Sequence, residues 1–392
     1  MKKYIILSAF ALEKELVASS RIYGLTKSLK KLGNEIVLCS PNVNVENVFV
    51  YDFIDKFLCL PIKENPFLEK IRKIYNKNKI FEVDNNEIHN FSLHKNVHSL
   101  IHNNILWYDH FYSPASKQYL RVKYSNRLLK KIALELTGFN TILLTSSGPS
   151  IMNYFGYKIK KKNPNIFWVA DYRDLNQNNP YKSDKYNFKG KRMDKLAFKY
   201  ADLITTVSYG AKEQNIENAK KMGYDIRDRT YVLYNGFSLE NNSLELSSKE
   251  ELKSLFVDKD KIYIVYTGSI YPLQKIEYFL KVLTDSQQLK FIYAGNSHQL
   301  IDVSVQKFNL EDKVINLGFV KKEEAEYLQK KADILLLLKL IDGNKDKGMM
   351  TGKFYEYLTK NKKIMVIGDQ DEEFNEICKN LKNVDILPYD KD

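Results

Sequence analysis

Short apolar runs alternate with amphipathic stretches along most of the chain. An apolar run at residues 4–8 is followed by a loop, a helical pattern at 19–32 that Gly33 ends, and a second apolar run at 35–39. A strand, a helix and a second strand in this order are typical of a βαβ unit. The pattern therefore predicts that the chain opens with a pair of parallel strands.

The alternation pauses over residues 61–131, which are irregular, and then resumes. A helical pattern covers residues 117–136. Further strands are predicted at 141–145, 166–170, 203–207 and 231–234, and further helices at 150–161, 193–200 and 210–222.

A polar, turn-rich stretch that begins at Asn235 and Gly236 separates this series from a second one. The second series predicts strands at 262–267, 290–294, 314–317, 334–338, 364–367 and 384–387, with helices between them. Runs such as 334–338 are apolar on both faces, as parallel strands covered by helices are. The predicted fold class is α/β, with two doubly wound, Rossmann-like domains, 1–238 and 239–392, facing each other across a cleft.

Composition agrees with a two-domain globular protein. The chain has 392 residues, 44% hydrophobic and 28% charged. No apolar run reaches the roughly 18–20 residues of a membrane span, and a buried strand explains the apolar start better than a signal peptide. Cys39, Cys59 and Cys378 form neither a disulfide framework nor a metal pattern, which fits a reducing cytoplasm.

The net charge of +13 is unevenly distributed. Residues 61–131 carry 13 Lys and Arg against 6 Asp and Glu, interleaved with aromatic residues. This combination fits an anionic membrane surface or a polyanionic acceptor. Nucleic acid is the rival partner, but no nucleic-acid module is recognised, so none is expected. A Lys-rich, solvated face is the plain alternative.

The most informative loop precedes a helix near the C-terminus. Thr351, Gly352 and Lys353 open that helix, so its free N–H groups and the Lys353 ammonium can bind an anion. Glu356 lies one turn further on, where it can accept hydrogen bonds from sugar hydroxyls. An anion site beside a carboxylate indicates a nucleotide sugar, whereas a capped amphipathic helix would need no ligand.

A second loop of the same domain follows the strand at 262–267. Gly268 permits close approach of a ligand to the backbone, Ser269 follows it, and Lys275 begins the next helix, from which it could reach a diphosphate. An ordinary βα turn with a surface lysine is the alternative.

Three loops of the first domain also follow strands. Asp171, Arg173 and Asp174 follow the strand at 166–170 and could hold acceptor hydroxyls or form a local ion-pair cluster. Ser147 and Gly148, after another strand, could offer hydroxyl and N–H groups to a ligand or merely cap a helix. Ser20 and Arg21, at the first helix, could bind an anionic group or form a structural ion pair.

His94, His98 and His102 recur every four residues and would share one helical face. No cysteine or carboxylate cluster accompanies them, so we expect no metal site and no metal cofactor.

With these residues in view, the whole chain resembles bacterial GT-B glycosyltransferases of the glycosyltransferase family 4 type, especially those of capsule and lipopolysaccharide assembly. The order and spacing of several segments carry the resemblance. They are Ser20-Arg21, Leu29-Lys-Lys-Leu-Gly-Asn-Glu-Ile-Val37, Ser146-Ser-Gly-Pro149, Asp171-Tyr-Arg-Asp174, Ala201-Asp-Leu-Ile-Thr-Thr-Val-Ser208, Asn235-Gly236, Tyr266-Thr-Gly268, Gly318-Phe-Val, Ala332-Asp-Ile-Leu335 and Gly352-Lys-Phe-Tyr-Glu-Tyr-Leu358.

The resemblance implies a hexosyltransferase that uses a UDP- or GDP-sugar and a lipid-linked or polysaccharide acceptor. It places Lys275 at the diphosphate, Glu356 at the ribose, and Lys353 with Gly352 at the phosphates or donor sugar. Asp171, Arg173 and Asp174 would line the acceptor side. It further implies retention of anomeric configuration without a metal, and action in the cytoplasm, peripherally on the inner face of the cell membrane.

Three features depart from the family pattern. Ser269 stands where a basic residue is usual, and Gly348 stands where the first of two paired glutamates is usual, although many relatives of this subgroup lack that glutamate. The sequence also ends at Asp392, before the helices that normally cross back to the first domain, so that it is either truncated or without this crossover. A catalytically silent partner subunit and a nucleotide-sugar epimerase are therefore the alternative functions.

Overall fold

The computed structural model describes residues 1–9, 17–42, 53–61, 132, 134–136, 140–148, 150–177, 184–236, 250–271, 274–339, 350–368 and 371–388. The chain divides into two compact units. The first holds Met1–Gln177, Ser183–Thr206 and Ile216–Tyr231, and the second consists mainly of Val207–Asn215 and Val232–Asp392.

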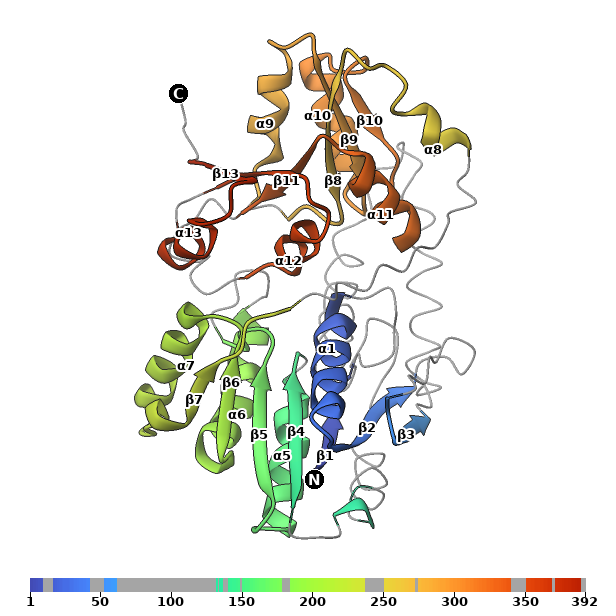
Figure 1. Ribbon diagram of the computed structural model, residues 1–392. Helices are drawn as coiled ribbons and strands as arrows, with labels where there is room; N and C mark the ends of the chain where they lie inside the picture. The colour runs from blue at the N-terminus through green and yellow to red at the C-terminus, as the bar shows by residue number, and fades with distance from the viewer. Residues whose placement is uncertain are drawn as a thin grey trace, which may run out of the picture. The chain divides into compact units, whose positions relative to one another are not determined.

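The first unit is built on a seven-stranded sheet with the strand order β3-β2-β1-β4-β5-β6-β7 (Figure 1). The strand pairs whose register is described are parallel, for example Lys3 with Glu35 and with Thr141. The strands are β1 (Lys3–Leu7), β2 (Glu35–Asn42), β3 (Lys56–Pro61), β4 (Thr141–Ser147), β5 (Phe167–Tyr172), β6 (Leu203–Thr206) and β7 (Thr230–Val232). The helices are α1 (Val17–Lys31), α5 (Ile151–Lys162), α6 (Asp184–Tyr200) and the second half of α7 (Tyr209–Lys221), with a 3₁₀ turn at Arg227–Arg229. The first half of α7 belongs to the second unit.

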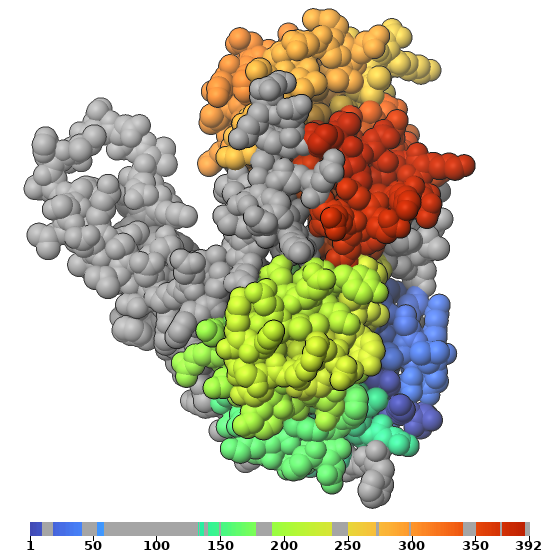
Figure 2. All heavy atoms as spheres, turned by 90° about the vertical axis from the view of Figure 1, so that its left-hand side faces the viewer, coloured from blue at the N-terminus to red at the C-terminus, as the bar shows by residue number. Residues whose placement is uncertain are grey.

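Helices cover both faces of this sheet because successive strand residues point to opposite sides. Ile5 belongs to a buried cluster that includes Phe155 of α5 and Phe198 of α6. Ile6, the next residue, belongs to a cluster that includes Ile22 of α1. In Figure 1, α1 accordingly lies on the opposite side of the sheet from α5 and α6, and in Figure 2 the yellow-green segment that contains α7 forms much of the visible surface of this unit.

The second unit holds a six-stranded sheet with the order β10-β9-β8-β11-β12-β13, again parallel in the described registers. Its strands are β8 (Ile262–Thr267), β9 (Leu289–Ala294), β10 (Val314–Asn316), β11 (Ile334–Leu338), β12 (Lys363–Ile367) and β13 (Val384–Leu387). Its helices are α8 (Glu250–Ser254), α9 (Ile276–Leu283), α10 (His298–Phe308), α11 (Lys322–Lys331), α12 (Gly352–Leu358) and α13 (Glu372–Cys378).

This sheet is also covered on both faces. Val265 packs in a cluster with residues of α11, α12 and α13, whereas Tyr266 packs with residues of α9 and α10. Because all these strands run parallel, the loops that follow β8, β11 and β12 emerge at one edge of the sheet, which is where ligands of open α/β sheets bind.

The predicted fold class of two doubly wound parallel-sheet domains is confirmed, and β8, β11 and β13 have the predicted bounds. The strand β3 was missed, and α6 begins nine residues before the predicted 193. Several predictions lie outside the described residues: the insertion at residues 61–131 almost entirely, the histidines at 94, 98 and 102, Gly348, and the boundary between 238 and 239.

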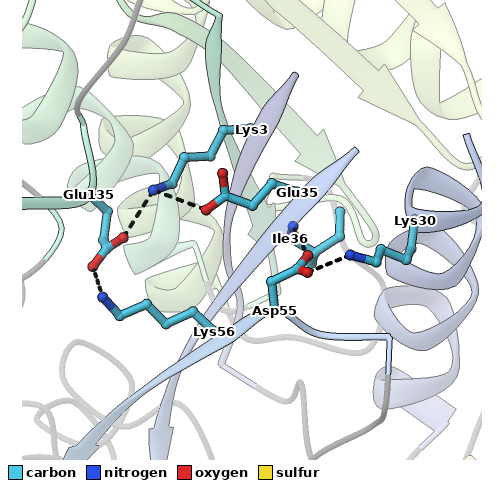
Figure 3. A network of polar contacts seen from close by, with 7 residues as sticks. All are labelled: Lys3, Lys30, Glu35, Ile36, Asp55, Lys56 and Glu135. Carbon is cyan, nitrogen blue, oxygen red and sulfur yellow. Dashed lines mark hydrogen bonds and ion pairs between the residues drawn. The ribbon is translucent and has the colours of Figure 1, made fainter. Parts of the chain in front are cut away.

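A polar network near the amino ends of β1 and β3 holds the missed strand β3 in place (Figure 3). Lys56 pairs with Glu135, which also accepts from Lys3 at 3.1 Å. Asp55, just before β3, pairs with Lys30 and accepts from the backbone N–H of Ile36 at 2.8 Å. The hydrogen bond from Lys56, with further help from Lys3, keeps the pKa of Glu135 below its usual value, so the carboxylate remains charged and the network intact near neutral pH.

Within the described residues, no helix combines the length and apolar character that a membrane span requires.

We predict that Gly156→Ala destabilises the first unit and that Gly24→Ala stabilises it. A Cβ on Gly156 of α5 would lie 2.3 Å from Cε2 of the buried Trp168, whereas a Cβ on Gly24 of α1 meets nothing within 4 Å. Overpacking costs about 1–3 kcal/mol, and removing an exposed helical glycine gains about 0.5–1 kcal/mol. Urea unfolding of both variants measures the change in the free energy of unfolding. Equal changes in the two variants would contradict the close packing of Gly156 against Trp168.

Candidate functional site

Gly268, the first residue after β8, is hydrogen-bonded on both sides at the carboxyl edge of the second sheet. The backbone N–H of Gly268 donates to the carbonyl of Ala294 at 2.7 Å, and the hydroxyl of Tyr293 donates to the carbonyl of Gly268 at 3.1 Å. A Cβ at Gly295 would lie 2.1 Å from that same carbonyl oxygen. Two loops thus approach each other at a distance that only glycine at 295 allows.

Lys353 of α12 reaches across to this loop. Its Nζ donates to the hydroxyl of Tyr266 at 2.7 Å and to the carbonyl of Ser269 at 3.3 Å, and lies 4.3 Å from the centre of the Tyr266 ring. Gly268 has φ +108°, and a Cβ there would lie 2.6 Å from Cε of Lys353. The predicted site residues Gly268, Ser269 and Lys353 therefore lie in contact with one another.

Thr351 and Gly352 lie beside Lys353 as predicted from the loop. Thr351 is the residue before α12, and its hydroxyl accepts a hydrogen bond from the backbone N–H of Lys353 at 3.3 Å. This cap fixes the start of the helix and hence the direction of the Lys353 side chain.

Burial lowers the pKa of Lys353 to about 8, and the charge of Glu356 only partly offsets this effect. The groups described in direct contact with the ammonium are neutral, namely the Tyr266 ring and hydroxyl and the Ser269 carbonyl. A bound anion would supply the missing negative charge and favour the charged lysine. The electrostatics of the site thus favour binding of an anion near Lys353.

Glu356 is held by residues that the sequence analysis did not select. Nε2 of Gln329, on α11, donates to Oε1 of Glu356 at 3.0 Å and to the hydroxyl of Thr267 at 2.8 Å. The backbone N–H of Thr267 donates to the hydroxyl of Tyr357 at 3.2 Å. Because Gln329 and Tyr357 lie within helices with no loop or glycine signal, only their contacts in space reveal them.

Lys275 lies directly before α9 and is exposed. The contacts described for the second unit do not join it to Lys353 or Glu356. A different lysine, Lys339, is buried at the end of β11, where its Nζ lies 3.4 Å from Oδ2 of Asp371 and 4.6 Å from the centre of the Phe374 ring. Lys339 is a second cation near the carboxyl edge that the sequence analysis did not select.

In the first unit, Asp171 is fully buried and its carboxylate is already occupied. Nε and Nη2 of Arg21 donate to it at 3.1 and 2.6 Å, and the hydroxyls of Thr205 and Ser146 at 2.7 and 3.2 Å. Burial alone would raise the pKa of Asp171, but Arg21 and the two hydroxyls hold it below its usual value. This arrangement suits a residue that positions the loops after β4 and β5, because no part of Asp171 is exposed to a ligand.

Arg173 and Asp174 are more accessible. Nη2 of Arg173 donates to the carbonyl of Gly148 at 2.9 Å and to Oδ2 of Asp174 at 3.0 Å. A Cβ at Gly148, whose φ is +138°, would lie 2.7 Å from Nη2 of Arg173. The predicted residues Gly148, Arg173 and Asp174 therefore meet at this edge, with Asp174 half-exposed.

Ser147 is buried and Ser20 exposed. The Ser147 hydroxyl pairs with the amide of Asn176, whose Nδ2 also donates to Asp194 at 2.7 Å. Asp194 accepts further hydrogen bonds from Tyr172 and Gln177, and burial raises its pKa to about 6. These contacts fix the Ser147 side chain inside the unit, away from solvent.

Within the residues that the structure describes, no three His, Cys, Asp or Glu side chains come together as a metal site would require.

Comparison with known proteins identifies the fold. No family model matches the chain. The crystal structure of Anabaena Alr3699/HepE in complex with UDP aligns with a TM-score of 0.60 at 10% identity, over 99% of this chain and 86% of that one. Sucrose-phosphate synthase (tll1590) from Thermosynechococcus elongatus aligns with a TM-score of 0.61 at 11% identity, again over 99% and 86%. The chain has the GT-B fold.

One curated relative of this GT-B chain is an uncharacterized glycosyltransferase, MJ1607, from Methanocaldococcus jannaschii. It is 27% identical over 145 residues, which make up 34% of this chain. The matched region spans 35% of the relative's own length.

We predict that Gly268→Ala displaces the Lys353 side chain, because the added Cβ would occupy the place of its Cε. The amine then reaches water, so its pKa should rise from about 8 towards the ordinary value of 10.5. NMR titration of the lysine Cε signals measures this change. Gly223→Ala is the control, since Gly223 also has a positive φ but no atom within 4 Å of a Cβ; a Lys353 pKa that stays near 8 in Gly268→Ala would contradict the proposed contact.

Proposed function

We propose that this GT-B chain is a glycosyltransferase that moves a hexose from a UDP- or GDP-sugar to a lipid-linked or polysaccharide acceptor. The observation that carries the proposal is the pair of side chains on α12: an ammonium, Lys353, held among neutral groups, and a carboxylate, Glu356, one turn away. A diphosphate and a ribose present the complementary charge and hydroxyl donors. Two of the solved structures of similar fold were obtained with UDP and with UDP-glucose bound.

In this proposal the second domain binds the donor. Lys353 stabilises the negative charge that develops on the leaving diphosphate, and the backbone N–H groups of Thr351 and Gly352 add to it. Glu356 accepts hydrogen bonds from the ribose. Gly268 and Ser269 bring backbone close to the phosphates, and Lys275 supplies a further cation from an exposed position.

The reaction breaks the bond between the anomeric carbon and the diphosphate oxygen and forms one to an acceptor hydroxyl oxygen. We propose retention of configuration without a metal, in which the acceptor proton passes to the leaving diphosphate. The chemical demand on the protein is then stabilisation of the leaving group, which fits Lys353 as a catalytic residue.

The first domain would bind the acceptor. Arg173 and Asp174 are its partly accessible charged residues in the proposed site, together with Gly148 and the exposed Ser20. Arg21, Asp171 and Ser147 are buried and would act by positioning those loops. The basic and aromatic composition of residues 61–131 supports a peripheral position on an anionic membrane. On the family resemblance we further propose a cytoplasmic location and a role in capsule or lipopolysaccharide assembly.

Turnover of a panel of UDP- and GDP-sugars, with and without lipid and glycan acceptors, tests the proposal. We expect release of the nucleoside diphosphate that depends on an acceptor. Product formed without acceptor would indicate an epimerase instead, and no binding or turnover of any donor would leave a silent partner subunit as the better reading.

The Lys353→Met variant should lower kcat/KM by about 10²–10³-fold, the usual effect of removing one stabilising group for a developing charge. In the wild type, kcat/KM should fall as pH rises through about 8, because the free lysine then loses its proton. The variant should lack this fall. The pH profiles of kcat/KM for both proteins measure it, and an identical decline in the two would assign it to another group.

The Glu356→Ala variant should weaken donor binding about 10–100-fold, as expected for loss of a hydrogen bond to a charged group. Because the ribose is remote from the reacting bond, the effect should be on KM with little change in kcat. Glu323→Ala, which removes an exposed carboxylate from α11, is the control. Unchanged donor affinity in Glu356→Ala would remove Glu356 from the site.

A further inference from the structure

Gln329 is a buried polar residue between the two elements that carry the donor site. It lies on α11 with 1% of its surface exposed. Its single amide nitrogen makes both of its hydrogen bonds, to the Thr267 hydroxyl at the end of β8 and to Oε1 of Glu356 on α12. The side chain thus connects three elements at the carboxyl edge of the second sheet.

The orientation of this amide carries the inference. Its oxygen, Oε1, has no hydrogen-bond partner among the described residues, although it is buried. Turning the amide over could give that oxygen the Thr267 hydroxyl as a donor, but it would also set the oxygen against the Glu356 carboxylate, and two acceptors repel each other. In the observed orientation the amide donates to Glu356 and its oxygen is left unpaired. A buried polar atom without a partner costs free energy.

The hydrogen bond restricts how Glu356 can act. Because Oε1 is held by Gln329, the rotation of the carboxylate is fixed, and no described residue donates to the other oxygen, Oε2. Thr267 is fixed in turn, since its N–H donates to the hydroxyl of the fully buried Tyr357. A carboxylate with one oxygen tied down and the other unused is preorganised to accept hydrogen bonds from a ligand.

We propose that Gln329 is a positioning residue, which orients Glu356 so that Oε2 accepts hydrogen bonds from the ribose hydroxyls of the donor. The inference rests on the proposed function. Gln329 would then contribute to nucleoside recognition without touching the ligand. Its loss would weaken binding of the ribose but not of the diphosphate.

Calorimetric binding of UDP, GDP and inorganic pyrophosphate to the full chain tests this, because pyrophosphate has no ribose. We expect Gln329→Leu, which keeps the size but removes the donors, to weaken binding of the preferred nucleotide about tenfold, the factor of a lost hydrogen bond. Pyrophosphate binding should not change. In the Glu356→Ala background the same substitution should have no further effect, since the two residues act through one contact.

Leu328→Ala is the matched control, because Leu328 is the buried neighbour of Gln329 and belongs to the apolar core. It should lower the melting temperature and leave the ratio of nucleotide to pyrophosphate affinity unchanged. Equal weakening of nucleotide and pyrophosphate in Gln329→Leu, no weakening of either, or a further loss in the Glu356→Ala background would overturn the positioning role alone. A wild-type chain that binds none of the three ligands would overturn the proposed function, and the role of Gln329 with it.

Discussion

The contact between the Lys353 ammonium and the loop after β8 is the interaction on which the rest of the donor site depends. The lysine reaches Tyr266 and Ser269 only because Gly268 has no side chain. The same contact joins α12 to the end of β8, and Glu356 of that helix bonds to Gln329. A cation held by a ring, a hydroxyl and a carbonyl is partly desolvated without being neutralised, which raises its attraction for an anion above that of a surface lysine.

The charged residues considered for the site are paired in the first unit and unpaired with each other in the second. In the first unit, Arg21 and Asp171 are buried together, and every hydrogen bond described for Asp171 comes from within that unit. Such a pair is costly to break, because removing one partner leaves an uncompensated buried charge. It suits the maintenance of loop geometry. In the second unit, the hydrogen bonds of Lys353 and Glu356 are only partly buried, and no described contact pairs the Lys353 ammonium with a carboxylate, which suits ligand binding.

Sequence patterns predicted most of the fold because parallel strands covered on both faces are continuous apolar runs, as in residues 334–338. The edge strand β3 was missed because it is short, begins at Lys56 and ends at Pro61, and because Lys56 pairs with Glu135, 79 residues away in the chain. No local pattern contains that contact. The early start of α6 was missed because its first turns are polar and lack an apolar period.

Part of the candidate site could also be predicted from the sequence, because the predicted strands are parallel. The rule that loops of parallel strands share one edge selected Gly268 and Lys353, which the structure brings together. It could not select Gln329 or Tyr357, which lie inside helices. The rule also selected Asp171, since a position after a strand does not reveal whether a side chain turns towards solvent or, as here, towards Arg21. Lys275 was selected in the same way, and it lies exposed without a described contact to Lys353.

The close approach of Gly295 to the carbonyl of Gly268 has a consequence for how such a chain can evolve. A side chain at 295 would clash with that carbonyl, and a side chain at 268, where φ is +108°, would clash with the side chain of Lys353. A side chain at 295 is therefore blocked by backbone whether or not the lysine is present, and a side chain at 268 stays strained by the positive φ even after the lysine is lost. The lysine can be replaced without either clash. Among descendants of this sequence, both glycines should outlast the lysine.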